Sequence, residues 1–475
     1  SNLQSGQPVI TGTINASGPD LPTLLEVAGQ LQGGRNSALA GYGRELQNSP
    51  NQDFLLRTRF DANMETGNLN VPELELNALG TVISGNVTGS EVNTETPVLR
   101  GRLNASGPDL PLLMQIVGQI SGGRESSLNQ YGRNLRNIPG KNFTLNAPFD
   151  INMARGNIDL SGLQANFLGF RLSGELQATN FQNANGTMIG ELSLSGRNLG
   201  PVLNALDQAD LAEVVESLNL NMAINGRPAN LTLSPFNLDL ILSGPRIPNS
   251  PVTLALRANS ILDIENETLA TESFTLAGLG LNLQGSLQAN NVMSDINYNG
   301  KLSLPAFNLR RFMQQINQPV PVTMDNTVFE SFALATSFSG SSDDLQLRQL
   351  DFTLDESRIS GDFSLAGLSS ATTPAMDFDL AINRINLDRY LAPATDTPAG
   401  AEIGNTELPL DTLRELNIKG EINVGQLTYS NLNLNDLALT INASNGQLAL
   451  APVTANLYQG AYSGDIRLNV NDALP

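Results

Sequence analysis

The chain has 475 residues and a formal net charge of −20; hydrophobic residues make up 40% of it and charged residues 15%. This charge argues against nucleic-acid binding, because phosphates are neutralised by Lys and Arg, and against a broad docking surface for anionic lipid head groups. The absence of Cys excludes a disulfide framework, and a chain of this length is expected to form several domains or an elongated array.

One short motif returns at five points along the chain and indicates a protein built of repeats. Each copy begins with Asp or Asn, whose side chain accepts hydrogen bonds from the first N–H groups of a helix, and apolar residues follow at helical spacing. The five starting residues are Asp20, Asp109, Asn198, Asn308 and Asn386. We therefore expect a short helix to close each repeat.

The first two repeats align without a gap at a shift of 89 residues. Residues 12–25 read GTINASGPDLPTLL and residues 101–114 read GRLNASGPDLPLLM. A helical half, over 19–47 and over 108–137, precedes a strand half in each of these repeats. We expect the helical half to break at its glycines, since an interior Gly weakens a helix by about 1 kcal/mol relative to Ala.

The repeat plan divides the chain into five segments. They are repeat 1 at 1–100 with an incomplete N-terminus, repeat 2 at 101–186, repeat 3 at 187–300, repeat 4 at 301–375 and a C-terminal repeat at 376–475. Periodicity is lost at 392–408, where Pro, Ala, Thr and Gly dominate, so a flexible loop is expected there. The chain begins inside a β-like segment, and we expect an anchor or signal upstream of it.

The strand halves alternate apolar and polar residues, as at 465–470 (DIRLNV), which predicts antiparallel strands with one apolar and one solvated face. Asn-Gly pairs at 185–186, 225–226, 299–300 and 445–446 predict two-residue hairpin turns, because both central residues of such turns need positive φ. The predicted fold is mainly β: an elongated repeat array of antiparallel strands that forms a twisted groove, with a short helix closing each repeat.

The residue inventory excludes several kinds of catalytic site. His and Cys are absent, which removes nucleophilic triads, thiolates and His-ligated zinc. Two acidic groups, Asp343-Asp344 and Asp351 with Asp355-Glu356, have residue types that suit Ca²⁺ or a glycosidase carboxylate pair. We favour solvated strand edges and turns, where charge also discourages edge-to-edge pairing. We therefore expect no enzymatic activity, no catalytic residue, no metal and no cofactor.

The continuous apolar face of the strands is the remaining feature. Roughly 25 strands about 4.8 Å apart would span on the order of 100 Å, and short helices would shield only part of that face. It is either a dry core or a channel for acyl chains, and periodicity alone does not separate the two. The residues expected to line the groove and bind lipid are Leu238, Leu240, Leu242, Phe274, Leu276, Leu281, Leu283, Phe378, Leu380, Ile382, Ile466 and Leu468.

The C-terminal repeat carries a recognisable succession of segments. Residues 386–391 read NLDRYL, residues 445–448 read NGQL and residues 455–464 read ANLYQGAYSG, with the Pro- and Ala-rich loop after the first of them. This succession resembles the C-terminal part of the AsmA family of bacterial envelope proteins. The resemblance is specific over roughly 375–470, and further toward the N-terminus it rests on the repeat plan. The near-identical first two repeats depart from the family pattern.

The resemblance implies a large periplasmic protein of a Gram-negative bacterium, anchored to the inner membrane by a segment outside this chain. It implies a long β-groove, of the bridge-like lipid-transfer type, that transfers or shelters lipid and supports phospholipid homeostasis and biogenesis of the outer membrane. The expected partners are phospholipid acyl chains and, through segments outside this chain, the inner and outer membranes. Two alternatives stay open: a scaffold with a dry core that assists outer-membrane protein assembly, and a repeat adhesin or filament.

Overall fold

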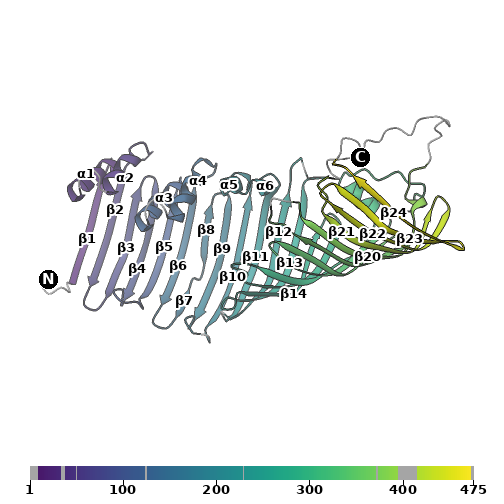
Figure 1. Ribbon diagram of the computed structural model, residues 1–475. Helices are drawn as coiled ribbons and strands as arrows, with labels where there is room; N and C mark the ends of the chain where they lie inside the picture. The colour runs from purple at the N-terminus through teal and green to yellow at the C-terminus, as the bar shows by residue number, and fades with distance from the viewer. Residues whose placement is uncertain are drawn as a thin grey trace. The chain divides into compact units, whose positions relative to one another are not determined.

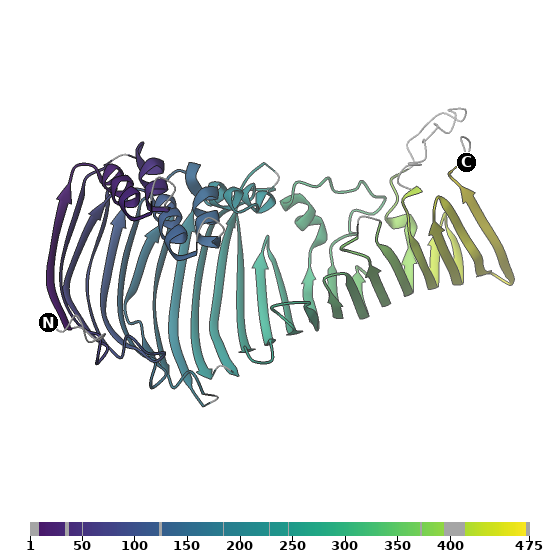
Figure 2. The ribbon, with the colours of Figure 1, turned by 60° about the vertical axis from the view of Figure 1, so that its left-hand side comes forward.

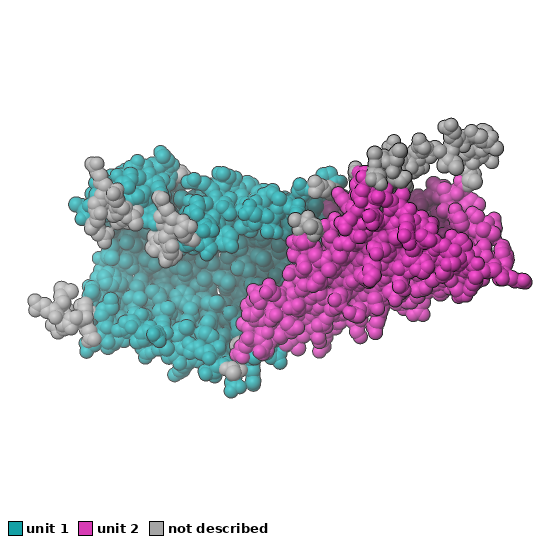
Figure 3. All heavy atoms as spheres, in the orientation of Figure 1, with its two compact units in different colours: residues 1–246 teal, residues 247–475 magenta. Residues whose placement is uncertain are grey.

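The structure is a computed structural model, and it divides the chain into two units, residues 1–246 and 247–475 (Figure 3). Both units are built of strands that pair mostly with their neighbours in the sequence, which confirms the predicted mainly β fold. The division into five repeats is finer than this one and stays a prediction. The residues that the structure describes are 9–33, 38–49, 51–122, 126–183, 185–227, 229–245, 247–370, 373–393 and 414–471.

Unit 1 is an antiparallel sheet in which β7 and β8 are two pieces of one strand, because both pair with β6 on one side and with β9 on the other. Its strands are β1 (Val9–Gly18), β2 (Phe54–Asn63), β3 (Asn68–Ala78), β4 (Thr81–Ser90), β5 (Val98–Gly107), β6 (Phe143–Asn152), β7 (Asn157–Asp159), β8 (Leu163–Phe167), β9 (Phe170–Thr179), β10 (Thr187–Arg197), β11 (Val215–Arg227) and β12 (Asn230–Leu242).

The helices of unit 1 lie beside the same ends of its strands, as Figure 1 and Figure 2 both show. They follow β1, β5 and β10, and these three strands run in the same direction because an even number of strand steps separates them. The helices are α1 (Leu21–Gly33), α2 (Ala38–Leu46), α3 (Leu110–Gly122), α4 (Ser127–Asn134), the 3₁₀ turn η1 (Leu135–Asn137), α5 (Gly200–Ala205) and α6 (Ala209–Ala212).

Unit 2 repeats the plan with fewer helices in its described part. Its elements are β13 (Val252–Asp263), β14 (Thr268–Gly278), β15 (Leu281–Asn290), β16 (Asn297–Phe307), α7 (Leu309–Gln315), β17 (Phe332–Ser341), β18 (Asp344–Leu354), β19 (Ser357–Ala366), β20 (Ala375–Asn386), the 3₁₀ turn η2 (Leu387–Arg389), β21 (Ile418–Tyr429), β22 (Leu432–Ser444), β23 (Gln447–Leu457) and β24 (Gly460–Asn469).

One pairing in unit 2 departs from the antiparallel order. β21 pairs with β20 in parallel, with Leu380 beside Ile422 and Ile382 beside Val424. For two strands to be parallel, the chain between them must run back from the end of the first strand to the level at which that strand began. The loop expected at 392–408 falls in this connection, and its residues 394–408 lie outside the described part of the chain.

A helix or a 3₁₀ turn follows each of the five motif copies, and the predicted side-chain capping is confirmed at four of them. The side chains of Asp20, Asp109, Asn308 and Asn386 accept hydrogen bonds from the backbone N–H groups of Thr23 (2.9 Å), Leu112 (2.9 Å), Arg311 (2.8 Å) and Asp388 (3.1 Å). Asn198 does not cap α5, because it has a φ of 55° and Leu199 takes the position before the helix without a side-chain bond. The break that was expected at the glycines falls next to residues 34–37 and 123–125, which lie outside the described part of the chain, so it stays a prediction.

The Asn-Gly prediction holds at only one of its four sites. Asn445-Gly446 joins β22 to β23 with φ values of 49° and 71°, as a type I′ turn requires. The pairs at 225–226 and 299–300 lie inside β11 and β16, and the pair at 185–186 ends a longer connection between β9 and β10. Leu-Gly pairs with both φ values positive form three other tight turns: Leu79-Gly80, Leu168-Gly169 and Leu279-Gly280.

Fully buried hydrophobic residues are few in the described part of the chain. One cluster forms around Leu135, Ile138, Leu168 and Val202, where α3, η1 and α5 meet the ends of β8 and β9. Elsewhere, β-bulges interrupt the strand register, as at 259–260 in β13 and 347–350 in β18. Bulges bend strands and increase their twist, so these sheets are curled single layers rather than flat ones.

Candidate functional site: an uncovered apolar face

The lining residues predicted on β14 and β15 lie on one face. Leu276 is opposite Leu283, and Phe274 is opposite Gly285, so the two strands present these side chains together. Leu281 opens β15 two residues before Leu283 and lies on the same face because strand side chains alternate. Opposite residues of antiparallel strands are close enough for their side chains to touch. An apolar surface therefore crosses this hairpin.

The same face continues across the parallel pairing. Ile382 lies opposite Ile359 on β19 and beside Val424 on β21. Leu380 lies beside Ile422, which in turn is opposite Leu439 on β22. Each row thus passes from strand to strand without a polar residue between its members. The change from antiparallel to parallel order does not interrupt the apolar face.

The last predicted residues lie on β24. Ile466 is opposite Leu450, and Leu468 is opposite Leu448, both on β23. Ile466 is 58% exposed, because β24 has a partner strand on only one side in the described part of the chain. Between these groups, Leu304, Leu334 and Phe352 lie opposite one another on β16 to β18, and Phe352 lies opposite Ile359. The apolar face of unit 2 therefore extends from β14 to β24.

Phenylalanine rings lie over glycines of the neighbouring strand along this face. A Cβ atom added to Gly285 would stand 2.6 Å from Cζ of Phe274, and one added to Gly420 would meet the ring of Phe378. Glycine is needed at both positions because any side chain would occupy the space of the ring. The rings fill the surface between strands and make the face continuous.

Three predicted lining residues belong to unit 1. Leu238, Leu240 and Leu242 lie on β12, opposite Leu220, Leu218 and Val215 of β11. They form the apolar face of the last hairpin of unit 1, and the nine others lie in unit 2. The structure thus brings the twelve together as two groups, one in each unit.

This apolar face has no second layer over it in the described part of unit 2. None of the twelve predicted side chains is fully buried: eleven are half-buried and Ile466 is exposed. β13 to β24 form one layer, and α7 and η2 are the helices described there.

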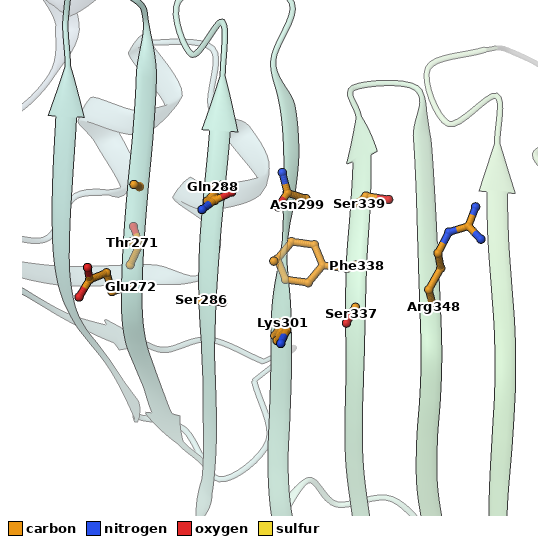
Figure 4. A pocket seen from close by; sticks show the side chains of 12 residues that line it. Thr271, Glu272, Ser286, Gln288, Asn299, Lys301, Ser337, Phe338, Ser339 and Arg348 are labelled. Carbon is orange, nitrogen blue, oxygen red and sulfur yellow. The ribbon is translucent and has the colours of Figure 1, made fainter.

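The opposite face of unit 2 is polar and contains a hollow that the sequence analysis did not single out. Its volume is about 420 Å³. Gln288, Asn299 and Ser339 are neighbours on three adjacent strands at one level of it, and Lys301 and Arg348 also line it (Figure 4). The sequence signal for this hollow was the set of polar residues that alternate with the apolar ones along these strands. A phenylalanine ring also lines the hollow, so the lining combines polar side chains with an aromatic one.

The acidic groups considered for calcium or glycoside chemistry have structural partners. Arg358 donates to both carboxylate oxygens of Asp351, at 2.8 and 2.7 Å, and these bonds lower the pKa of Asp351. Asp343 accepts from the backbone N–H of Ser369 at 3.1 Å and also from its hydroxyl. No group of three or more potential metal-ligating residues is found in the described ranges.

The remaining acidic residues, Asp355 and Glu356, have partners in the NLDRYL segment at 386–391. Arg389 donates to Asp325 at 2.7 Å and also contacts Glu356, and the hydroxyl of Tyr390 donates to Asp355 at 2.9 Å. Burial, followed by the Asp355 carboxylate, raises the pKa of Tyr390. These bonds tie η2 to the segment after α7 and to the turn between β18 and β19. They hold the end of β20 in place and give these three carboxylates partners within the fold.

The fold and the apolar face define a mainly β protein of single-layered sheets with a long uncovered apolar surface. The family model of the AsmA family matches residues 162–473, and the chain belongs to this family of bacterial envelope proteins. The match extends well beyond the C-terminal repeat in which the resemblance is most specific. No match to the chain was found among curated proteins or among solved structures. No described helix is long and apolar enough to cross a membrane.

Proposed function

We propose that this chain is a non-enzymatic carrier or shelter for phospholipid acyl chains in the periplasm, where it supports outer-membrane phospholipid homeostasis. The observation that carries the proposal is the apolar face of unit 2, whose rows cross successive strands of a single layer. Removing apolar surface from water stabilises a protein by roughly 25 cal/mol per Å². An acyl chain lying on this face removes apolar surface of both partners from water without any catalytic group.

The dimensions of the face suit such a ligand. One leaflet of a bilayer core is about 15 Å thick, half of roughly 30 Å. Strands lie about 4.8 Å apart, so an extended acyl chain laid across the strands covers about three of them. The apolar face of unit 2 crosses β14 to β24 and is several times wider. A lipid can therefore move along the face while its chains keep equivalent apolar contacts.

Membership of an envelope family supports the periplasmic location, and the inner-membrane anchor outside this chain is part of the same proposal. The alternative scaffold for outer-membrane protein assembly was framed with a dry core. The described residues of unit 2 provide no layer that would form that core, and this favours the carrier. No observation favours the adhesin or filament.

A charge placed on the apolar face tests the proposal. Leu380→Glu puts a carboxylate into a row beside Ile422, whereas Ala381→Glu puts the same group on the opposite, exposed face of β20. Ile466→Glu adds a charge at an exposed position of the apolar face, where the fold tolerates it. Each purified protein is analysed for bound phospholipid by native mass spectrometry and by extraction, and its fold is checked by circular dichroism.

We expect Leu380→Glu and Ile466→Glu to retain severalfold less phospholipid than the wild type, and Ala381→Glu to retain as much. An unpaired carboxylate on an apolar surface is costly to desolvate, which is the reason for the loss. Equal lipid in all variants, or a wild-type protein that binds no phospholipid, would contradict the proposal.

A further inference from the structure

Two hollows on the polar face of unit 2 adjoin each other. The hollow of about 420 Å³ described above shares part of its lining with a second hollow of about 610 Å³. The shared residues include Glu272, Ser286, Lys301 and Ser337. Because both hollows use the same side chains, they form a single depression, which we call the polar trough.

The strand register arranges the side chains of the polar trough in three rows, each of which crosses β15, β16 and β17. The rows are Gln288 with Asn299 and Ser339, Ser286 with Lys301 and Ser337, and Gln284 with Ser303 and Ala335. Figure 4 shows the first two rows. Successive rows are two residues apart along the strands, so the three rows span roughly 14 Å at about 3.4 Å per residue. The polar trough is therefore long enough for a chain-like ligand.

The polar side chains of these rows do not bond to one another. In the part of the chain that the structure describes, the side chains of Gln288, Asn299 and Lys301 form no hydrogen bond or ion pair. Polar neighbours on other strands of unit 2 do bond: the hydroxyl of Thr428 donates to Asn433, its partner on the next strand, at 2.9 Å. The polar trough thus keeps its donors and acceptors available to a ligand.

The charged side chains of the polar trough favour a ligand that carries an anion among hydroxyl groups. Lys301 lies at the centre of the middle row, and Arg348 is opposite Ser337 at the end of that row. Glu272 is a carboxylate that accepts hydrogen bonds from hydroxyl groups. The first hollow therefore contains two cations and one carboxylate, in a chain whose net charge is −20.

Three classes of chain-like ligand differ in how well they match this lining. An acyl chain would leave the carboxamides and charges of the polar trough without partners. Extended peptides are recognised through backbone bonds at an open sheet edge, but β15, β16 and β17 each have a partner strand on both sides. Sugar hydroxyl groups both donate and accept, as carboxamides and serine hydroxyls do. The polar trough therefore suits an oligosaccharide best.

We propose that the polar trough binds an acidic oligosaccharide, with a carboxylate of the sugar at Lys301 and its acetamido and hydroxyl groups at Gln288 and Asn299. A hydrogen bond between an ammonium group and a carboxylate is stronger than one between neutral groups. A carboxamide can bond to both the N–H and the C=O of an acetamido group. This inference goes beyond the proposed function, because it uses the polar face of the strands and needs no lipid.

Two disaccharides that differ by one carboxylate test the inference. The acidic probe is N-acetylglucosaminyl-N-acetylmuramic acid, and the neutral probe is di-N-acetylchitobiose, which lacks the lactyl carboxylate. Lactate is the anion alone, and triglutamate is an acidic peptide. Affinities are measured by ligand-detected NMR titration of the whole chain.

The variants separate the charge from the carboxamides. Lys301→Gln removes the central cation, and Gln288→Ala with Asn299→Ala removes the two carboxamides. Lys419→Gln is the matched control, because it makes the same change at an exposed position of β21 outside the polar trough. The substituted residues are all exposed, so each variant is expected to fold, and thermal unfolding checks this.

We expect Lys301→Gln to bind the acidic disaccharide about tenfold more weakly, because it loses a charge-assisted hydrogen bond, and to bind the neutral one as the wild type does. The double carboxamide variant should bind both disaccharides about tenfold more weakly. Lys419→Gln should match the wild type with both probes.

Other results would overturn the inference. Equal affinity of the wild type for the two disaccharides would show that the carboxylate is not recognised. Lactate or triglutamate binding as tightly as the acidic disaccharide would indicate an anion site or a peptide site instead of an oligosaccharide site. A wild-type chain that binds neither disaccharide, or unchanged binding in both trough variants, would overturn the site itself.

Discussion

The carboxylate of Asp388 accepts a hydrogen bond from the backbone N–H of Asn431 at 2.9 Å and so joins η2 to the turn between β21 and β22. The N–H of Ser430 donates to the same carboxylate at 2.6 Å, and both turn residues have positive φ, 50° and 60°. The turn reaches η2 because β21 runs parallel to β20 and ends at the same edge. Asp388 therefore lies where the pairing changes from antiparallel to parallel.

Asp388→Ala should destabilise the turn between β21 and β22 and the strands that it joins. The substitution removes the acceptor of two backbone N–H groups, and bonds of this kind contribute about 1–3 kcal/mol. We expect the free energy of unfolding of unit 2 to fall by that amount in urea denaturation. Hydrogen exchange at residues 430–431 should accelerate. Asp377→Ala, at an exposed position of β20, is the control and should leave both measurements unchanged.

Asp325 should titrate at unusually low pH. Hydrogen bonds from the side chain and backbone of Thr327, and then from Arg389, lower the pKa of Asp325 from 3.8 to about 2. Because the folded-state pKa is the lower one, the stabilisation is present above the unfolded value and is lost as the pH falls toward 2. Carboxyl NMR titration should give a midpoint near the lowered value in the wild type. Thr327→Val should move it upward, and a wild-type midpoint at the ordinary value would contradict the hydrogen bonding described.

Gly420 should not tolerate even a methyl group. A Cβ atom at this position meets the ring of Phe378 on β20, and Gly420 is buried. Gly420→Ala is expected to destabilise unit 2 by about 1–3 kcal/mol, as overpacking does. Phe378→Leu should recover part of this loss in a double-mutant cycle. Gly460→Ala is the control, because its added Cβ has 3.7 Å to its nearest neighbour, an ordinary contact. Additive effects of the Gly420 and Phe378 substitutions would show that the ring is not the obstacle.

Strand alternation and helix capping were readable from the sequence because both depend on neighbouring residues. The period-two pattern placed Leu276 and Leu283 on one face. The repeated Asp or Asn motif placed Asp20 and Asp109 at helix starts. The parallel pairing of β21 was not readable, because parallel and antiparallel strands have the same period. Strand direction is set by the connection, and that segment has no periodic pattern.

The polar hollow of unit 2 was missed for a different reason. Gln288 and Asn299 look like ordinary solvated strand residues in the sequence. Only the register of β15 with β16 places them side by side.

At the Leu-Gly turns, burying the leucine side chain outweighs the preference for Asn at a positive φ. Leu168 allows a test of this. Leu168 has a φ of 51°, where Asn is preferred over Leu, yet its side chain is only 8% exposed, within the buried cluster. Leu168→Asn should therefore destabilise unit 1 by about 2 kcal/mol, since losing a buried leucine outweighs a better turn residue. Ser430→Asn makes the same kind of change at an exposed turn position with a φ of 50°, and there we expect no loss in urea denaturation. If Leu168→Asn were as stable as the wild type, local backbone preference rather than packing would control these hairpins.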